Sequence, residues 1–115
     1  MRKMPMILYV GRDPQLYIDL GAAGFGYVRC EDINSAVTLL SNKLKSDVVL
    51  CDRALETNND GLYFAKLLRK ARHKVIVLWT TTPVKGVLAY RMLAGSNQKL
   101  MVKIRKVLAS PKAKR

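Results

Sequence analysis

The sequence predicts an α/β fold in which one parallel sheet of five strands, in the order 2-1-3-4-5, has helices on both faces. Short apolar runs alternate with amphipathic stretches along the chain, and turn residues separate them. Several of the runs are apolar without a break, which is typical of parallel strands buried on both sides. A length of 115 residues suits one core. We therefore expect residues 1–115 to form a single domain, with a basic tail at about 110–115.

The first half of the chain predicts two strand–helix units. Met6–Val10 is an apolar run of strand length. A helix is expected over Pro14–Ala23, because proline favours the first helical position and Asp13 is a suitable N-cap. Tyr27–Cys30 is a short second strand. Asp32 is the candidate cap of a second helix, whose apolar residues recur at helical spacing: Ala36, Val37, Leu39, Leu40 and Leu44.

The second half predicts three further units of the same kind. The expected strands are Asp47–Cys51, Lys74–Trp79 and Lys99–Lys103. The expected helices are one that follows the polar loop 56–61, one over Pro83–Ala94 and a short last helix over Ile104–Leu108. A helix is assigned between each pair of strands because parallel neighbours need a long, right-handed crossover.

The charge is distributed unevenly along the chain. The formal net charge is +13, yet residues 1–60 carry seven bases and all eight acids. Residues 61–115 carry fourteen bases and no acid. This asymmetry favours a polyanion or an acidic protein as the partner of the second half, with improved solubility as the alternative explanation.

Several classes of protein are disfavoured by composition. One histidine and two cysteines, Cys30 and Cys51, show no spacing typical of a zinc site, and neither a base–nucleophile pair nor a glycine loop suited to phosphate binding is recognisable. We therefore expect no enzyme, no metal and no cofactor. The apolar runs are far shorter than the roughly 20 residues of a membrane span, and the first residues do not form a signal peptide. A cytoplasmic protein without membrane contact is expected.

In an open parallel sheet, ligands bind beyond the carboxyl ends of the central strands. Gly11 and Arg12 follow the first predicted strand, and Asp52 follows the third. Thr80 follows the fourth, and Lys103 ends the fifth. The predicted topology therefore gathers a carboxylate, a hydroxyl and an ammonium group at one rim.

The order and spacing of these residues resemble the receiver domain of two-component response regulators over about residues 6–110. Val48–Asp52, followed by Asp60-Gly61-Leu62 at a helix start, is similar to the receiver phospho-acceptor segment. Val75–Thr80 is similar to the fourth strand with its switch hydroxyl, although Thr81 is a second candidate. Met92–Gly95, followed by a strand that ends in Lys103, resembles the approach to the receiver lysine.

The resemblance implies a flavodoxin-like receiver fold and gives roles to three residues. Asp52 matches the phospho-acceptor, Thr80 the switch residue and Lys103 the base that contacts the phosphoryl group. The chain departs from the receiver pattern where two adjacent acids hold Mg²⁺, because Gly11 and Arg12 stand there. The receiver aromatic, three residues before the lysine, is replaced by Leu100 in this assignment.

Mg²⁺ prefers oxygen ligands, so at most weak binding is expected at a site without these acids. We hypothesise instead that Arg12 pairs with Asp52 and takes the place of the metal, because a guanidinium group suits a carboxylate. The alternative is that Arg12 points into solvent. Cys51 is expected to point into the core.

The resemblance implies a signalling module, here an atypical receiver that binds an acidic or signalling protein without phosphorylation or Mg²⁺. Its expected surface is the basic side formed by the helix over 83–94, the fifth strand and the last helix. The candidate contact residues are Lys85, Arg91, Lys99, Arg105 and Lys106. Two alternatives are a nonspecific nucleic-acid binder that uses the basic half and a phosphorylatable response regulator with Asp52 as acceptor. A second copy of the chain is a further candidate partner.

Overall fold

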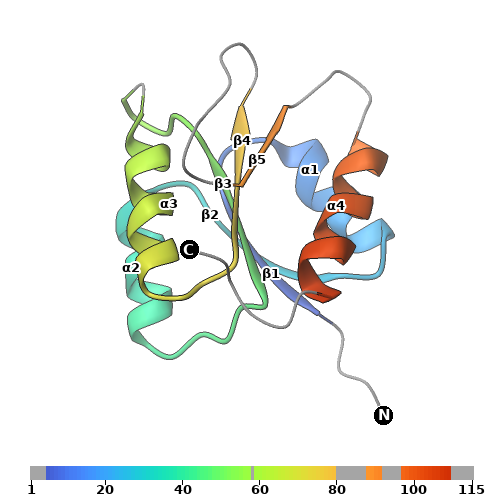
Figure 1. Ribbon diagram of the computed structural model, residues 1–115, viewed down its shortest axis with the longest axis horizontal. Helices are drawn as coiled ribbons and strands as arrows, with labels where there is room; N and C mark the ends of the chain where they lie inside the picture. Colours follow the sequence, from blue (N-terminus) through green and yellow to red (C-terminus); the bar gives the residue numbers. More distant parts are fainter. Residues whose placement is uncertain (1–4, 58, 80–87, 92–96, 110–115) are drawn as a thin grey trace.

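Five parallel strands form one sheet in the order β2-β1-β3-β4-β5, as predicted (Figure 1). The strands are β1 (Met6–Val10), β2 (Gly26–Cys30), β3 (Val48–Asp52), β4 (Val75–Trp79) and β5 (Ala89–Arg91). This computed structural model describes residues 5–57, 59–79, 88–91 and 97–109. Within these ranges β1, β3 and β4 occupy the middle of the sheet, so the continuous apolar runs of the sequence are the central strands.

Helices cover both faces of the sheet. Among the described residues, α1 (Pro14–Ala22) and α4 (Asn97–Ala109) pack on one face, and α2 (Ile33–Ser41) and α3 (Asp60–Lys70) on the other (Figure 1). None of the helices in this part of the chain is long and apolar enough to cross a membrane.

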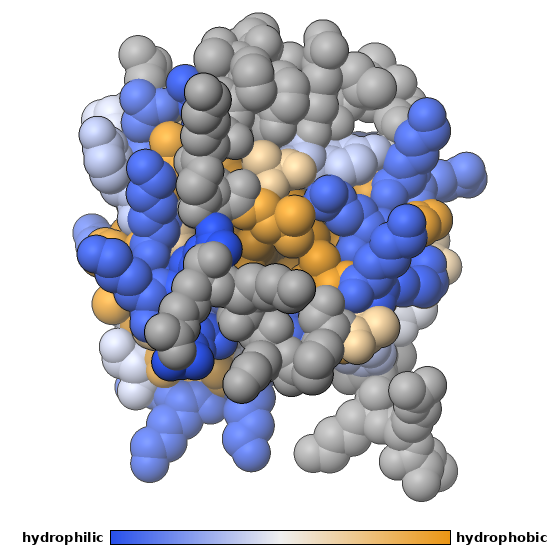
Figure 2. All heavy atoms as spheres, in the orientation of Figure 1, coloured by the Kyte–Doolittle hydropathy of each residue, from blue (hydrophilic) through white to orange (hydrophobic). Residues whose placement is uncertain are grey.

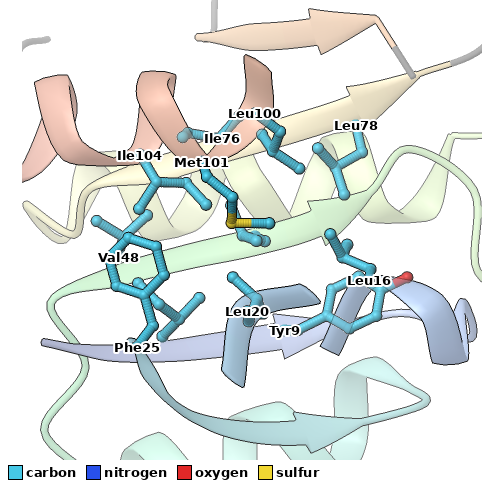
Figure 3. Packing of buried hydrophobic residues seen from close by; sticks show 12 residues of the cluster. Tyr9, Leu16, Leu20, Phe25, Val48, Ile76, Leu78, Leu100, Met101 and Ile104 are labelled. Carbon is cyan, nitrogen blue, oxygen red and sulfur yellow. The ribbon is translucent and has the colours of Figure 1, made fainter. Parts of the chain in front are cut away.

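The core consists of two apolar clusters separated by the sheet. Successive residues of a strand point to opposite faces. Tyr9 therefore packs on the side of α1 and α4, whereas Leu8 and Val10 pack on the side of α2 and α3. Figure 3 shows the first cluster, in which the Tyr9 ring lies beside Leu16 of α1 with its oxygen at the margin of the apolar group. This margin is the carboxyl edge of the sheet.

The starts of the first two helices confirm the predicted caps. The Asp13 carboxylate accepts a hydrogen bond of 3.0 Å from the Gln15 N–H, and Pro14 is the first residue of α1. The Asp32 carboxylate accepts one of 2.7 Å from the Ser35 N–H at the start of α2. Each carboxylate satisfies an N–H that the helix itself leaves without a partner. The capping residues in the sequence were therefore sufficient to predict where these two helices begin.

The second half of the chain differs from the prediction. Residues 89–91, expected in a helix over Pro83–Ala94, form β5, and Lys99–Lys103, expected as the fifth strand, lie within α4. Only residues 80–88 separate β4 from β5, which is fewer than the dozen or so of a usual helical crossover. The fifth strand therefore comes about ten residues earlier than predicted, and the last helix is longer than predicted. Residue 88 directly precedes β5, and residues 83–87 and 92–94 of the expected helix lie outside the described ranges.

This shift moves one of the predicted site residues. Lys103 lies half-buried in the middle of α4 and not at the carboxyl end of a strand, so its assignment as the receiver lysine is wrong. The apolar residues that suggested a strand there, Leu100, Met101 and Ile104, are buried on one side of α4. Their spacing also fits a helix face. Thr80, Lys85 and the expected tail at 110–115 lie outside the described residues.

Candidate functional site

The candidate site lies at the carboxyl edge of the sheet, where Asp52 ends β3. Cys51 is paired with Val10 of β1, so the next residue pair along these strands is Asp52 and Gly11. On the other side Asp52 is paired with Leu78 of β4, and the Arg53 N–H donates a 2.9 Å hydrogen bond to the Leu78 carbonyl. Asp52 is thus fixed between two central strands, and strand alternation turns its side chain towards α1.

Tyr9 holds the Asp52 carboxylate. The Tyr9 hydroxyl lies 3.1 Å from Oδ1 and 3.3 Å from Oδ2 of Asp52, and it accepts a 3.1 Å hydrogen bond from the Asp13 N–H. The Tyr9 side chain is completely buried. Tyr9 and Asp52 lie on the same face of adjacent strands, one step apart diagonally, and a tyrosine side chain spans that step. A single phenol therefore links the start of α1 to Asp52.

Gly11 provides the space for this contact. A Cβ atom at Gly11 would collide with Oδ2 of Asp52 and with the hydroxyl and ring of Tyr9. The space that a side chain at position 11 would take is consequently occupied by the phenol of Tyr9. Glycine is needed here for close approach rather than for an unusual backbone angle.

The predicted ion pair between Arg12 and Asp52 is not found among the described residues. Arg12 contacts Asp52 through its main-chain N–H, at 3.4 Å from Oδ2. The Arg12 side chain is exposed and lines an open hollow beside α2, together with Arg29 and Asp32. The hypothesis was wrong because the side chain of Tyr9, three residues before Arg12, reaches the Asp52 carboxylate from inside the core. The polar partner that compensates Asp52 is a neutral hydroxyl.

The environment of Asp52 disfavours its charge. Burial raises the pKa of Asp52 to about 6, although hydrogen bonds from Tyr9 and from the Arg12 N–H act to lower it. The neighbouring Asp13 charge raises it further, and Arg12 acts weakly in the opposite direction. Burial and the Asp52 charge likewise raise the pKa of Tyr9. The phenol therefore stays protonated and donates its hydrogen to Asp52.

The loop after Asp52 is ordered by Asp60 at the start of α3. The Asp60 carboxylate accepts hydrogen bonds from the N–H groups of Leu55 (2.7 Å), Glu56 (2.9 Å), Thr57 (3.3 Å) and Gly61 (2.9 Å). Burial acts to raise the pKa of Asp60, but these donors together lower it. Gly61 is required by close packing, since a Cβ atom there would collide with the Asp52 carbonyl oxygen. The predicted helix start at Asp60-Gly61 therefore fixes the backbone next to Asp52.

The two cysteines belong to the core. Cys30 and Cys51 are both free and buried, and Cys51 faces the cluster of α2 and α3, away from the Asp52 side chain. Burial raises the pKa of both thiols, that of Cys30 to about 11. Neither thiol is therefore suited to act as a thiolate.

The described residues at the rim do not provide a ligand set that fits a Mg²⁺ ion. Among the described residues no three acidic, histidine or cysteine side chains lie close enough together to hold a metal. The Asp13 carboxylate caps α1, and Tyr9 occupies the space next to Asp52. Mg²⁺ requires several oxygen ligands in octahedral geometry. One buried carboxylate beside a neutral phenol does not meet this requirement.

The predicted partner residues lie on different elements. Lys99 and Lys106 are exposed on α4. Arg105 donates a 2.7 Å hydrogen bond to the Ala23 carbonyl, and its guanidinium lies 5.0 Å from the centre of the Phe25 ring. Arg105 therefore ties α4 to the end of α1. Arg91 belongs to β5 rather than to a helix.

Comparison with known proteins gives structural matches only. No protein-family model and no curated protein matches the sequence. A response regulator from Thermotoga maritima is 20% identical, with a TM-score of 0.76 over 94% of this chain and 100% of its own. The response regulator TrrA from Thermotoga maritima, in complex with Mg²⁺-BeF, is 22% identical with a TM-score of 0.77, over 90% of this chain and 99% of its own.

A third match comes from the complex of the histidine kinase ThkA with TrrA. It is 20% identical, with a TM-score of 0.75 over 92% of this chain and 100% of the matched chain. The matches cover almost the whole chain. The resemblance found in the sequence is thus confirmed at the level of the fold: this chain has the flavodoxin-like fold of response regulator receiver domains.

Proposed function

We propose that this chain is an atypical receiver, a signalling module that binds a protein partner and whose Asp52 does not take up a phosphoryl group with Mg²⁺. The observation that carries the proposal is the Tyr9 hydroxyl on the Asp52 carboxylate, in the space left by Gly11. Phosphoryl transfer requires positive charge to neutralise the charge that develops on the phosphoryl oxygens. A neutral phenol supplies a hydrogen bond but no charge, and it engages both oxygen atoms of the carboxylate that would have to attack.

The position of β5 supports the same proposal. Receivers place an aromatic residue three positions before their lysine, and β5 contains Tyr90 as its middle residue. The third residue after Tyr90 is Leu93, which lies outside the described ranges. A leucine has no charge with which to contact a phosphoryl group. On this assignment both the acidic pair and the lysine of a receiver are replaced, whereas the acceptor aspartate is retained.

The exposed side of α4 is the surface that we propose for the partner. Lys99, Val102 and Lys106 lie on one face of this helix, and Val102 is 52% exposed. Residues 61–115 carry no acid that could neutralise these lysines. An acidic protein surface would be steered towards this face. The TrrA–ThkA complex is a precedent in which a protein of this fold binds another signalling protein.

Charge reversal on α4 tests this surface. We expect the double variant Lys99→Glu/Lys106→Glu to reduce capture of a protein partner from native lysate about tenfold or more, because both charges belong to one contact face. The matched control is Lys43→Glu/Lys45→Glu at the end of α2, which changes net charge equally and should leave capture nearly unchanged. Capture is quantified after nuclease treatment. Equal losses in both variants, or loss of all bound protein with nuclease, would contradict the proposal and favour a charge-driven or nucleic-acid-dependent interaction.

A further inference from the structure

The outer face of α3 exposes two large apolar side chains. Tyr63 is 65% exposed and Leu67 is 63% exposed. They are four residues apart, so they lie next to each other on the helix surface. The opposite side of α3 packs into the core through Phe64, Ala65 and Leu68. Tyr63 and Leu67 therefore form an apolar strip that the fold of this chain does not use.

Two lysines border this strip. Lys66 and Lys70 are exposed and lie three and seven residues after Tyr63, which places them on the same side of the helix. The acid at the start of α3, Asp60, is turned to four backbone N–H groups and does not neutralise these lysines. We call the surface formed by Tyr63, Lys66, Leu67 and Lys70 the α3 face.

We propose that the α3 face binds an amphipathic helix of a protein partner whose polar side is acidic. The apolar side of such a helix would bury Tyr63 and Leu67, and its carboxylates would meet Lys66 and Lys70. A nucleic acid would satisfy the lysines and stack on Tyr63, but it offers nothing apolar for the Leu67 side chain. Apolar anchors bordered by charges of one sign therefore favour a protein helix over a polyanion.

This surface is separate from the one in the proposed function. In Figure 1, α3 and α4 lie on opposite sides of the sheet, and Figure 2 shows hydrophilic side chains gathered on both flanks of the molecule. The α3 face contains no residue of α4 and no residue of the Asp52 site. One chain could thus hold two partners and act as an adaptor between them.

A defined peptide tests the α3 face without a known partner. The probe is a synthetic helical peptide with leucines along one side and glutamates on the other, and the control peptide has the same residues in an order that spreads the leucines around the helix. Binding is followed by amide shifts of the ¹⁵N-labelled chain. We expect saturable shifts centred on α3 with the first peptide and about tenfold or more weaker binding with the second.

Variants decide whether the strip carries the binding. Tyr63→Ser/Leu67→Ser is expected to weaken peptide binding about tenfold or more, and Lys66→Glu/Lys70→Glu similarly. The matched controls are Ile18→Ser and Val37→Ser, which remove exposed apolar side chains from α1 and α2. Circular dichroism verifies the fold of each variant.

Shifts centred on α4, equal losses in the controls, or tighter binding of an oligothymidylate to the α3 face would overturn the inference. Loss of lysate capture in the α4 variant with unchanged peptide binding would separate this inference from the proposed function.

Discussion

The variant Gly11→Ala is expected to lower the free energy of unfolding by about 1 to 3 kcal/mol, the usual cost of overpacking in a well-packed region. The added Cβ atom would overlap Oδ2 of Asp52 and the ring of Tyr9. Tyr9 is completely buried, so its ring has no room to move away, and the Asp52 carboxylate would have to turn outward and lose its hydrogen bond from Tyr9. Urea denaturation at pH 7 measures the loss.

Two comparisons show whether the loss comes from this contact. Gly21→Ala in α1 places a Cβ atom 3.5 Å from the Tyr27 ring, an ordinary contact, and should stabilise by about 0.5 to 1 kcal/mol because alanine favours helices. In a Tyr9→Leu background, Gly11→Ala should cost less than in the wild type, since the phenol is gone. An equal cost in both backgrounds would show that Gly11 and Tyr9 are independent, contrary to the geometry of the site.

The variant Asp52→Asn is expected to be more stable than the wild type at neutral pH, by about 1 to 2 kcal/mol. Burial raises the pKa of Asp52 in the folded state to about 6, whereas an aspartate in the unfolded chain titrates at about 4. The folded state therefore holds a proton between these values that the unfolded state has lost. The stability that Asp52 contributes is complete below about pH 4 and is lost as the pH rises through about 6.

The difference in unfolding free energy between Asp52→Asn and the wild type should consequently be small at pH 4, grow between pH 4 and 7, and then level off. Urea denaturation at intervals across this range measures it, and Asp47→Asn serves as a control carboxylate near the amino end of β3. A difference in unfolding free energy that is constant with pH, or that favours the wild type above pH 7, would mean that the folded protein does not disfavour the charged form of Asp52.

The first half of the fold could be predicted because each element has its own local signal. Asp13, Pro14 and Asp32 mark helix starts by chemistry that acts within a few residues. The prediction failed in the second half of the chain, where it assumed that a helix connects each pair of parallel strands. Only residues 80–88 connect β4 to β5, so β5 begins earlier in the sequence than predicted. The spacing of Leu100, Met101 and Ile104 fits either a strand or one face of a helix.

The site was predicted in position but not in its chemistry. The end of a buried apolar run placed Asp52 at the rim correctly. Tyr9 was overlooked because it reads as one more apolar residue in the run over Met6–Val10. Strand alternation could have revealed the contact. Tyr9 and the residue position of Gly11, just after β1, face the same side of the sheet, so a tyrosine hydroxyl lies next to a residue without a side chain. Only the register of β1 against β3 shows that both meet Asp52.

We propose that the Tyr9 hydroxyl holds Asp52 in an arrangement that neither binds Mg²⁺ nor accepts a phosphoryl group. Intact mass spectrometry of the wild-type protein after incubation with acetyl phosphate and Mg²⁺ tests this claim most directly. We predict that the mass stays that of the untreated chain, because the phenol occupies the place beside the carboxylate and, among the described residues, no metal-binding cluster is present to neutralise the phosphoryl oxygens. A mass gain of one phosphoryl group in the wild type that is absent in Asp52→Asn would contradict it and establish Asp52 as a working acceptor.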